Sequence, residues 1–592
     1  MTTFERDAHL AELPWPFTGR AGELELVRRS LTAGRNGIVI TGPSGSGKTR
    51  LATEALRGTG CARVTGTPGT HRIPFAAFAH LLPESVSLHR AVQLLTGVRL
   101  LLVDDAHLLD DASAALVHHL ALHGRTRLVV VARDTAPLPG AVSRLWTGEV
   151  LPRLALEPLP DDDTARLLAA GTGGWLEPLT MNRLRRLSGG DLRLLRDLSA
   201  ALTEQGLLTP VPGTPTAAWH GPVPLTETVQ LRAAAVLGRA DPAERETLDR
   251  LAFAEPLTPH LDDGYDLPVL ERLESDGLVT VDPSGTLALA RPLYGPVLRA
   301  AAGTLRTRRL ARTPDECAAA LKSEAAALED RVEAADVRPL PLPVGEWLLA
   351  ETGTVPADYA ALRARYDRLR GALREAVAWA RQGLRSDPAD PLCRRELALG
   401  AAQLGEAPAP APAPDTPPQD PHTAWTEAYE AVRLGAAEGA AGALPPGSPF
   451  ARHAQALARG DGPALDRAAR ALEGRGFLLF AAEAHAQAAA VHRDPSAARL
   501  SRTRAITLAR RCQGARTPAL AGLALGELTA RQRQIVTLAA AGLSNRQIAD
   551  RLTLSIRTVG NHLYGAYTRL GASDRAALPW LTDLPDTQPV SA

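Results

Sequence analysis

The sequence predicts a multidomain protein: a parallel α/β domain comes first, winged-helix-like and all-α segments follow, and a small all-α domain comes last. Three observations predict this order. Near the N-terminus, short apolar runs bounded by polar or turn residues alternate with helical patterns, as expected for buried strands of a parallel sheet. Alanine- and leucine-rich helical patterns fill the middle of the chain. Near the C-terminus, capping residues mark three short helices.

Composition limits the possible classes of protein. The 592 residues carry a net charge of +1, so any signal for nucleic acid must be local. The four cysteines lie far apart and form no CxxC pair, which argues against a zinc or disulfide framework and fits a reducing cytosol. Because we find no signal peptide and no apolar run of 18 residues, we expect a cytoplasmic protein without membrane contact. The excess of Ala, Gly, Pro and Arg, with only two lysines, resembles the coding bias of a high-GC bacterium.

A glycine-rich loop follows the first predicted strand, residues 37–41. Residues 42–49 read GPSGSGKT and match the pattern GxxxxGK[ST]. The glycines let backbone N–H groups turn toward a phosphate, and the next helix presents its positive end to the same anion. Lys48, one of only two lysines among 66 basic residues, would reach the β- and γ-phosphates, and the Thr49 hydroxyl would bind Mg²⁺. We therefore predict ATP or ADP binding by Gly42, Pro43, Ser44, Gly45, Ser46, Gly47, Lys48 and Thr49.

Charged residues end the next two predicted strands. Asp104 and Asp105 follow the run at 100–103; Asp104 would hold Mg²⁺ and Asp105 could position the attacking water, or both could cap the next helix. Arg133 follows the run at 128–132 and either senses the γ-phosphate or is a solvated charge. Because aspartate is shorter than glutamate, we expect at most slow ATP hydrolysis that serves as a switch.

The middle of the chain is predicted from helical periodicity, one hairpin and one proline run. Residues 155–205 are helical in pattern, and 225–300 mix helices with the hairpin-like GLVTVDPSGTLALA. APAPAPAPDTPPQDP cannot form a helix interior because proline lacks the N–H donor. The expected domains are a leader (1–15), an ATPase core (16–155), a helical lid (156–210), a winged-helix-like domain (211–304), a helical arm (305–405), a Pro/Ala-rich linker (406–421), a helical repeat-like region (422–524), the small all-α domain (525–580) and a flexible tail (581–592).

Residues 528–571 carry the start and stop signals of three short helices joined by tight turns. Two capping boxes start the first and second helices, a serine can cap the third, and glycines end the first and third. Five apolar side chains supply a small core. The capping and stop residues are Thr529 with Gln532, Ser544 with Gln547, Ser555, Gly542 and Gly571, and the core residues are Ile535, Leu538, Ile548, Leu552 and Leu554.

The third of these helices has two unlike faces. Apolar residues at i, i+4, i+7 and i+11 form one face: Val559, Leu563, Ala566 and Leu570. The opposite face carries Arg557, Gly560, Asn561, Tyr564 and Thr568, a set that can enter a major groove. Residues 526–578 contain seven arginines and three acidic residues, which gives this segment a net charge of +4. We expect DNA contacts from Ser544, Asn545, Arg546, Arg557, Thr558, Asn561, His562 (alternatively a core residue), Tyr564 and Arg569; a bundle for protein contacts is the alternative.

These C-terminal residues resemble the LuxR-type helix-turn-helix over about fifty residues, from LTARQRQIV to TRLG. Gln532 stands where the family usually has glutamate, and it still completes the capping box. Gly560 stands where the family usually has lysine, which removes a DNA contact and costs about 1 kcal/mol of helix propensity. The resemblance therefore implies an all-α DNA-binding domain whose affinity is weak in isolation.

The N-terminal part resembles the signal-transducing ATPase module of large LuxR regulators, the LAL class of STAND-type ATPases. FTGRAGELELVRRSL at 17–31 is similar to the opening motif of that class, which implies a nucleotide contact for Arg20. DDAHLLDDAS at 104–113 and RPLY at 291–294 are similar to further motifs. SGGDLRLL at 188–195 stands where the family has a GNPL-like run.

Together these features predict an ATP-binding, sequence-specific DNA-binding transcriptional regulator, an activator of a gene cluster. Its nucleotide state would gate the helix-turn-helix. The implied partners are double-stranded DNA, RNA polymerase, an inducing ligand or protein, and a second copy of the chain, as a dimer at least on DNA. The alternatives are a DNA-tethered ATPase enzyme and a regulator with a degenerate ATP site.

Overall fold

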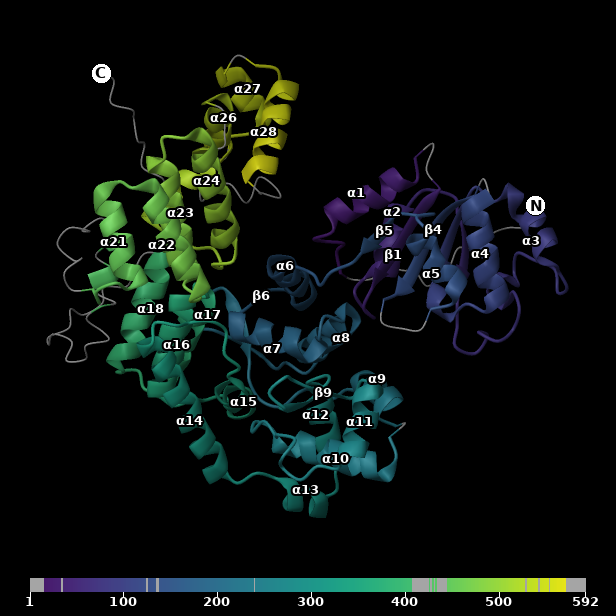
Figure 1. The fold of residues 1–592 in the computed structure, drawn as a ribbon, viewed down its shortest axis with the longest axis horizontal. Coiled ribbons are helices and arrows are strands. Elements are labelled where there is room, and N and C mark those ends of the chain that lie inside the picture. Colours follow the sequence, from purple (N-terminus) through teal and green to yellow (C-terminus); the bar gives the residue numbers. More distant parts are fainter. Residues whose placement is uncertain are drawn as a thin grey trace. The chain divides into compact units, whose positions relative to one another are not determined.

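The computed structural model divides into two compact units, residues 1–313 and 314–592 (Figure 1). It describes residues 15–32, 36–123, 126–134, 138–238, 240–406, 425, 428–430, 432–433, 444–526, 530–540, 543–552 and 554–570. Residues 1–14 of the expected leader, nearly all of the linker and the whole tail lie outside this set, as do Thr529, Gly542 and Gly571. Within the described residues, no helix is both long and apolar enough to cross a membrane.

A five-stranded parallel sheet forms the N-terminal part of the first unit, in the order β2-β3-β4-β1-β5. The three predicted apolar runs are confirmed as β1, β3 and β4, the three inner strands. The short strands β2 and β5 form the two edges. The bounds are β1 (Gly37–Gly42), β2 (Ala62–Thr65), β3 (Leu100–Asp104), β4 (Arg127–Arg133) and β5 (Arg153–Ala155).

Helices cover both faces of this sheet, and successive side chains of each inner strand point to opposite faces. Ile38 and Ile40 pack with α1 and α2, whereas Val39 packs with α3, α4 and α5 in a separate core. The same alternation holds along β3 and β4, so each strand is buried on both sides. The helices are α1 (Ala21–Ser30), α2 (Lys48–Ala55), α3 (Leu88–Leu94), α4 (Asp111–His123) and α5 (Gly140–Thr147).

The rest of the first unit is helical with two small sheets. Strands β6, β8 and β7 form a three-stranded sheet, and the expected boundary at residue 210 falls inside it, between β7 and β8. The predicted hairpin is confirmed as β9 and β10, which pair in antiparallel fashion. The elements are α6 (Asp161–Thr172), β6 (Trp175–Leu176), α7 (Pro178–Ser188), α8 (Leu192–Glu204), β7 (Leu208–Pro210), β8 (Thr216–Trp219), α9 (Glu227–Leu237), α10 (Pro242–Ala254), α11 (Leu267–Ser275), β9 (Val279–Val281), β10 (Leu287–Leu289), α12 (Tyr294–Ala301) and α13 (Thr304–Leu310).

The second unit is helical throughout its named elements, as the sequence predicts. Neighbouring helices pack against one another from α16 to α18 and again from α21 to α24, and α25 packs on α23 and α24. We use the term helical arm from here on for residues 314–526, which include most of the expected arm and the repeat-like region. Its helices are α14 (Pro314–Glu333), α15 (Pro343–Thr352), α16 (Ala357–Arg370), α17 (Leu373–Ser386), α18 (Pro391–Gln403), α21 (Pro449–Arg459), α22 (Gly462–Gly474), α23 (Leu478–Val491), α24 (Pro495–Arg510) and α25 (Pro518–Gly526). Three more helices follow: α26 (Ala530–Ala540), α27 (Asn545–Leu552) and α28 (Ile556–Leu570).

Candidate functional site

The glycine-rich loop joins β1 to α2, and its conformation requires glycine at two positions. Gly45 has φ of 75° and Gly47 has φ of 92°, both in the left-handed region that other residues rarely adopt. A Cβ on Gly45 would lie 2.0 Å from Cγ of Asp191, so the loop also approaches the segment before α8 closely. The loop is therefore shaped by backbone geometry, as the predicted phosphate cradle requires.

Lys48 is buried at the first position of α2 and bends back over the loop. Its Nζ donates to the carbonyl oxygens of Gly42 at 2.9 Å and Pro43 at 2.5 Å. Burial lowers the pKa of Lys48, while the nearby Asp105 and Asp134 carboxylates act in the opposite direction. The ammonium thus lies at the mouth of the loop, where an anion would gain most from it.

The Thr49 hydroxyl donates to Oδ1 of Asp104 at 2.9 Å, joining the loop to the end of β3. The amide of Asp105 donates to the same oxygen at 3.1 Å, and Nη2 of Arg63 donates to Oδ2 at 2.8 Å. The sequence did not point to Arg63, which lies on edge strand β2. A hydroxyl and a carboxylate oxygen this close are the hard oxygen donors that Mg²⁺ takes, and Arg63 balances the carboxylate charge from the other side.

Asp105 adopts a backbone conformation that is unusual for a non-glycine residue, with φ of 46°. Its side chain makes no cap bond to the following short helix, contrary to the capping alternative, and it lines the cavity beside the loop. His107 lies 3.9 Å from it, and both ring nitrogens of His107 are buried without a hydrogen-bond partner among the described residues. Burial lowers the pKa of His107, while the Asp105 carboxylate acts in the opposite direction. Residues held in such backbone regions cluster at functional sites.

A cavity of about 640 Å³ opens beside the loop, and both predicted arginines line it. Arg133 is the register partner of Gly42 in the sheet and has an exposed side chain. Arg20 is buried; it donates to Glu23 at 2.8 Å and to the Glu157 carbonyl at 2.5 Å. The lining also includes Trp15, Phe17, Ser44, Gly45, Ser46, Gly47, Lys48, Thr49, Arg63 and Asp105.

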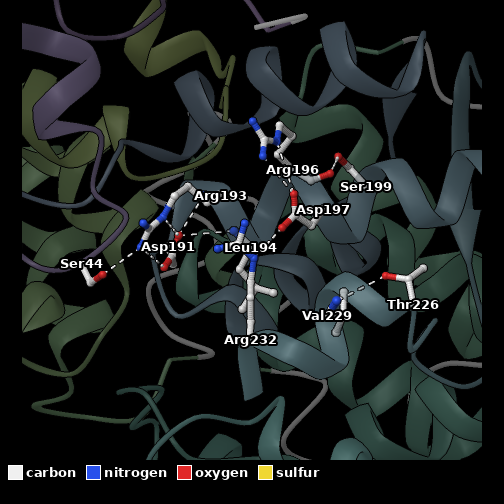
Figure 2. Close-up of polar contacts among 10 residues, drawn as sticks. All are labelled: Ser44, Asp191, Arg193, Leu194, Arg196, Asp197, Ser199, Thr226, Val229 and Arg232. Atoms are coloured by element: carbon white, nitrogen blue, oxygen red, sulfur yellow. Dashed lines mark hydrogen bonds and ion pairs between the residues drawn. The ribbon is translucent and has the colours of Figure 1, made fainter. Parts of the chain in front are cut away.

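The lid segment contacts the loop through residues that the sequence did not single out. Arg193 donates from Nη2 to Ser44 Oγ at 2.9 Å and pairs with Asp191 (Figure 2). The Leu192 amide donates to the Gly45 carbonyl at 3.0 Å. Burial opposes ionisation of Asp191, but the Arg193 guanidinium and two backbone amides outweigh it, so the pKa of Asp191 lies below its usual value. Asp191 also caps α8, which is the one sequence signal that could have marked it.

Further along α8, a second ionic group ties the lid to α9. Asp197 accepts from Arg196 at 3.2 Å and from Arg232 at 2.7 Å, and Figure 2 shows the three side chains together. Arg196 also lines the cavity. A displacement of α8 at the loop would therefore also displace or strain α9, which belongs to the following domain.

The C-terminal helices α26, α27 and α28 share the predicted core, and the predicted start caps of α27 and α28 are present. The second capping box is confirmed: the Ser544 amide donates to Gln547 Oε1 at 2.8 Å, and the Gln547 amide donates to Ser544 Oγ at 3.4 Å. Ser555 Oγ accepts from the Thr558 amide at 3.0 Å. The helices share one apolar core, with Ile535, Ile548, Val559, Leu563 and Ala566 buried and Leu538, Leu552 and Leu554 packed against it.

The outward face of α28 is polar, as its pattern predicts. Arg557 and Asn561 are exposed, Tyr564 is 76% exposed, and Thr558 and His562 are half-buried. No atom lies within 4 Å of a Cβ built on Gly560, so this position is open. Arg546 on α27 is exposed, Asn545 is half-buried, and the side chains of Thr568, Arg569 and Leu570 lie outside the described set.

Comparison with known proteins matches this C-terminal part. Residues 526–580 match the model of bacterial regulatory proteins of the luxR family. A protein of Mycobacterium bovis named as an HTH-type transcriptional regulator is 43% identical over 81 residues. That match covers 14% of this chain and 9% of the relative, so the chain spans about a tenth of the length of the curated relative it matches.

Two solved structures share weak overall similarity with the chain. A STAND ATPase with a tetratricopeptide-repeat sensor from Pyrococcus horikoshii is 13% identical, with 97% of this chain and 99% of that chain covered, at a TM-score of 0.25. The RuvB Holliday junction branch migration motor of Thermotoga maritima is 16% identical, with 50% and 94% covered, at a TM-score of 0.26. Residues 526–580 are therefore a luxR-family regulatory domain by their sequence match, and the described helices α26, α27 and α28 lie within it.

Proposed function

We propose that the protein is a cytoplasmic, ATP-binding transcriptional regulator that binds double-stranded DNA in a sequence-specific manner. The observation that carries the proposal is α28: its apolar side is buried in a three-helix core, and its polar side, with Arg557 and Asn561, is exposed. A helix of that kind suits the major groove, where Asn can bond a base edge and Arg a phosphate. Ser544, Asn545, Arg546, Thr558, His562, Tyr564 and Arg569 would add further contacts.

Nucleotide would bind over the loop at the N-terminus of α2. Backbone amides of 42–49 and the Lys48 ammonium would hold the phosphates. Thr49 and Asp104 would hold Mg²⁺, which neutralises phosphate charge when bound. Arg20 and Arg133 line the same cavity and would contact nucleotide directly or through neighbours. Asp105 would orient a water, and its short side chain favours slow hydrolysis, so that the bound nucleotide acts as a switch.

Gating of the helix-turn-helix by nucleotide would begin at the lid. Arg193 bonds Ser44, a loop residue that a phosphate would approach, so nucleotide would compete for or share this guanidinium. A movement of α8 that follows a change at Arg193 would pass to α9 through the ion pair of Asp197 with Arg232. A ligand shifts such an equilibrium only by its differential affinity for the two states, typically about 1–3 kcal/mol in known couplings.

The proposal has four further parts. The protein would activate a gene cluster, contact RNA polymerase, dimerise on DNA, and bind an inducing ligand or protein through its helical arm. Two other candidates give different results in vitro. A DNA-tethered ATPase enzyme would hydrolyse many ATP molecules per second when DNA is added. A regulator with a degenerate ATP site would fail to bind a fluorescent ATP analogue at physiological concentration.

The deciding experiment is genome-wide DNA occupancy with the wild type, Lys48→Ala and Asn561→Ala. We expect discrete occupied sites that Asn561→Ala abolishes and Lys48→Ala weakens or redistributes. Absence of discrete sites in the wild type would refute DNA-specific regulation. Unchanged occupancy in Lys48→Ala would refute nucleotide gating and leave DNA recognition in place.

A further inference from the structure

Charge in the helical arm is divided between its two halves. Residues 314–406 contain 12 basic and 16 acidic residues, a net charge of −4 with histidines neutral. Residues 449–512, which hold α21 to α24, contain eleven arginines and five acidic residues, a net charge of +6. Because the whole chain carries +1, this second half is a local concentration of positive charge larger than that of the helix-turn-helix.

Three of these arginines converge on one hollow between α21 and α22. Arg452 and Arg459 lie two turns apart on α21, Arg467 lies on α22, and all three line a cavity of about 250 Å³ together with Gln455. The three side chains are exposed, and none makes a hydrogen bond or ion pair with another described residue. Elsewhere in this arm, arginines are commonly paired, as Arg433 is with Glu483 at 2.6 Å.

Among the residues that the structure describes, one carboxylate lines the hollow, that of Asp461. This carboxylate is already engaged, because it caps α22 by accepting from the Ala464 amide at 2.9 Å. Three guanidinium groups therefore face solvent with one partly satisfied counter-charge, an arrangement that favours a phosphate or another oxyanion. The charge of the hollow suits a phosphate group, and the net charge of +6 on residues 449–512 favours a phosphate polymer over one small anion.

The chain itself brings this half of the arm close to DNA. Helix α25 packs on α23 and α24 and ends at Gly526, and α26 of the helix-turn-helix begins at Ala530. Four residues span at most about 14 Å, so the end of α25 lies within that distance of the start of α26. Helix α22 packs on α23, and α23 packs on α25. Because packed helices lie about 8–10 Å apart, the hollow lies within a few helix widths of the start of the helix-turn-helix.

We propose that the α21–α22 hollow and the basic half of the arm bind the phosphate backbone of DNA that flanks the site held by the helix-turn-helix. This second, sequence-independent contact rests on the proposed DNA-binding function. It adds salt-dependent affinity without base readout, and it compensates for the phosphate contact that Gly560 lacks on α28.

The test measures binding of the full chain to a duplex of about 40 base pairs of mixed sequence by fluorescence anisotropy at about 50–200 mM salt. The variant is Arg452→Gln/Arg459→Gln/Arg467→Gln. The matched control is Arg28→Gln/Arg99→Gln/Arg127→Gln, three exposed arginines of the N-terminal α/β domain. Their side chains make no hydrogen bond or ion pair with the described residues and lie outside the nucleotide cavity. Arg557→Gln reports on the helix-turn-helix alone, and circular dichroism verifies that each variant is folded.

Each phosphate contact contributes about 0.9 to the slope of log K against log salt. If all three arginines contact phosphates, the slope of the arm variant should be smaller in magnitude by up to about 2.7. Over the fourfold salt range, the wild type would then lose about 40-fold more affinity than the variant. An unchanged slope in the arm variant, or an equal loss in the control, would overturn the proposal. Loss of slope in Arg557→Gln alone would leave the proposed function standing without the arm contact, whereas no DNA binding by any protein would refute the function itself.

Discussion

Replacing Gly560 on α28 with lysine should strengthen both the helix and its hold on DNA. A Cβ at this position meets no atom within 4 Å, and its φ is not in the left-handed region, so the substitution introduces neither a clash nor backbone strain. Glycine costs the helix about 1 kcal/mol of propensity, so lysine at 560 should lower the equilibrium constant for local opening of α28 about fivefold. Hydrogen exchange of the α28 amides in the full chain measures that opening directly.

The added charge should also raise the salt slope of DNA binding by about 0.9, the value for one new phosphate contact. Gly560→Ala separates the two effects, because it has the helix propensity without the charge. Gly565→Ala is a second control on the same helix, where the new Cβ would lie 3.1 Å from Gln532 Nε2 and crowding offsets the gain. If Gly560→Ala reproduced the whole gain in affinity, or if the slope stayed the same in Gly560→Lys, position 560 would not face the DNA backbone.

Three further predictions concern the nucleotide site and its lid. Lys48→Ala should lower affinity for a fluorescent ATP analogue by more than about tenfold, and a change below about twofold would remove Lys48 from the phosphate site. Arg193→Gln should leave the fold intact but speed hydrogen exchange at the start of α8, since it removes the bond to Ser44; unchanged exchange would show that this contact does not dock the lid. The pKa of Asp191 is lowered, so its stabilising contribution is complete above about pH 4 and is lost as pH falls through the lower folded value. The stability difference between wild type and Asp191→Asn, measured by denaturant titration, should therefore be constant from about pH 5 to 8 and shrink in stronger acid.

The parts of the fold that could be predicted are those in which one local signal decides the structure. β1, β3 and β4 are continuous apolar runs because both faces of the sheet are covered, and such runs are visible in a sequence. The edge strands β2 and β5 are short and partly exposed, as ARVT and RLA, and nothing in their composition distinguishes them from loops. The helix-turn-helix was predictable because its caps, core and outward face agree within about fifty residues.

The candidate site also contains residues that the sequence predicts and residues that it does not. The loop, Asp104 and Asp105 are recognisable because the chemistry of the phosphate site fixes their spacing to adjacent strands. Arg63 and Arg193 reach the site from residues 41 positions before Asp104 and 149 positions after Ser44, by contacts that only the folded chain creates. In an arginine-rich chain, neighbouring residues do not show which arginine will contact the loop or Asp104. The partner of each arginine could not be identified before the tertiary structure was known.

The near absence of lysine gives the buried Lys48 a practical value in chemical proteomics. Apart from the amino terminus, an amine-directed acylating reagent meets two side-chain amines, one inside the phosphate loop and one, Lys322, exposed on α14. Lys48 Nζ lies beside the carbonyl oxygens of Gly42 and Pro43, where a bound phosphate would cover it. Mass-spectrometric readout of the two acylation yields would thus give a footprint of nucleotide occupancy with its own internal standard, in living cells as well as in the purified protein.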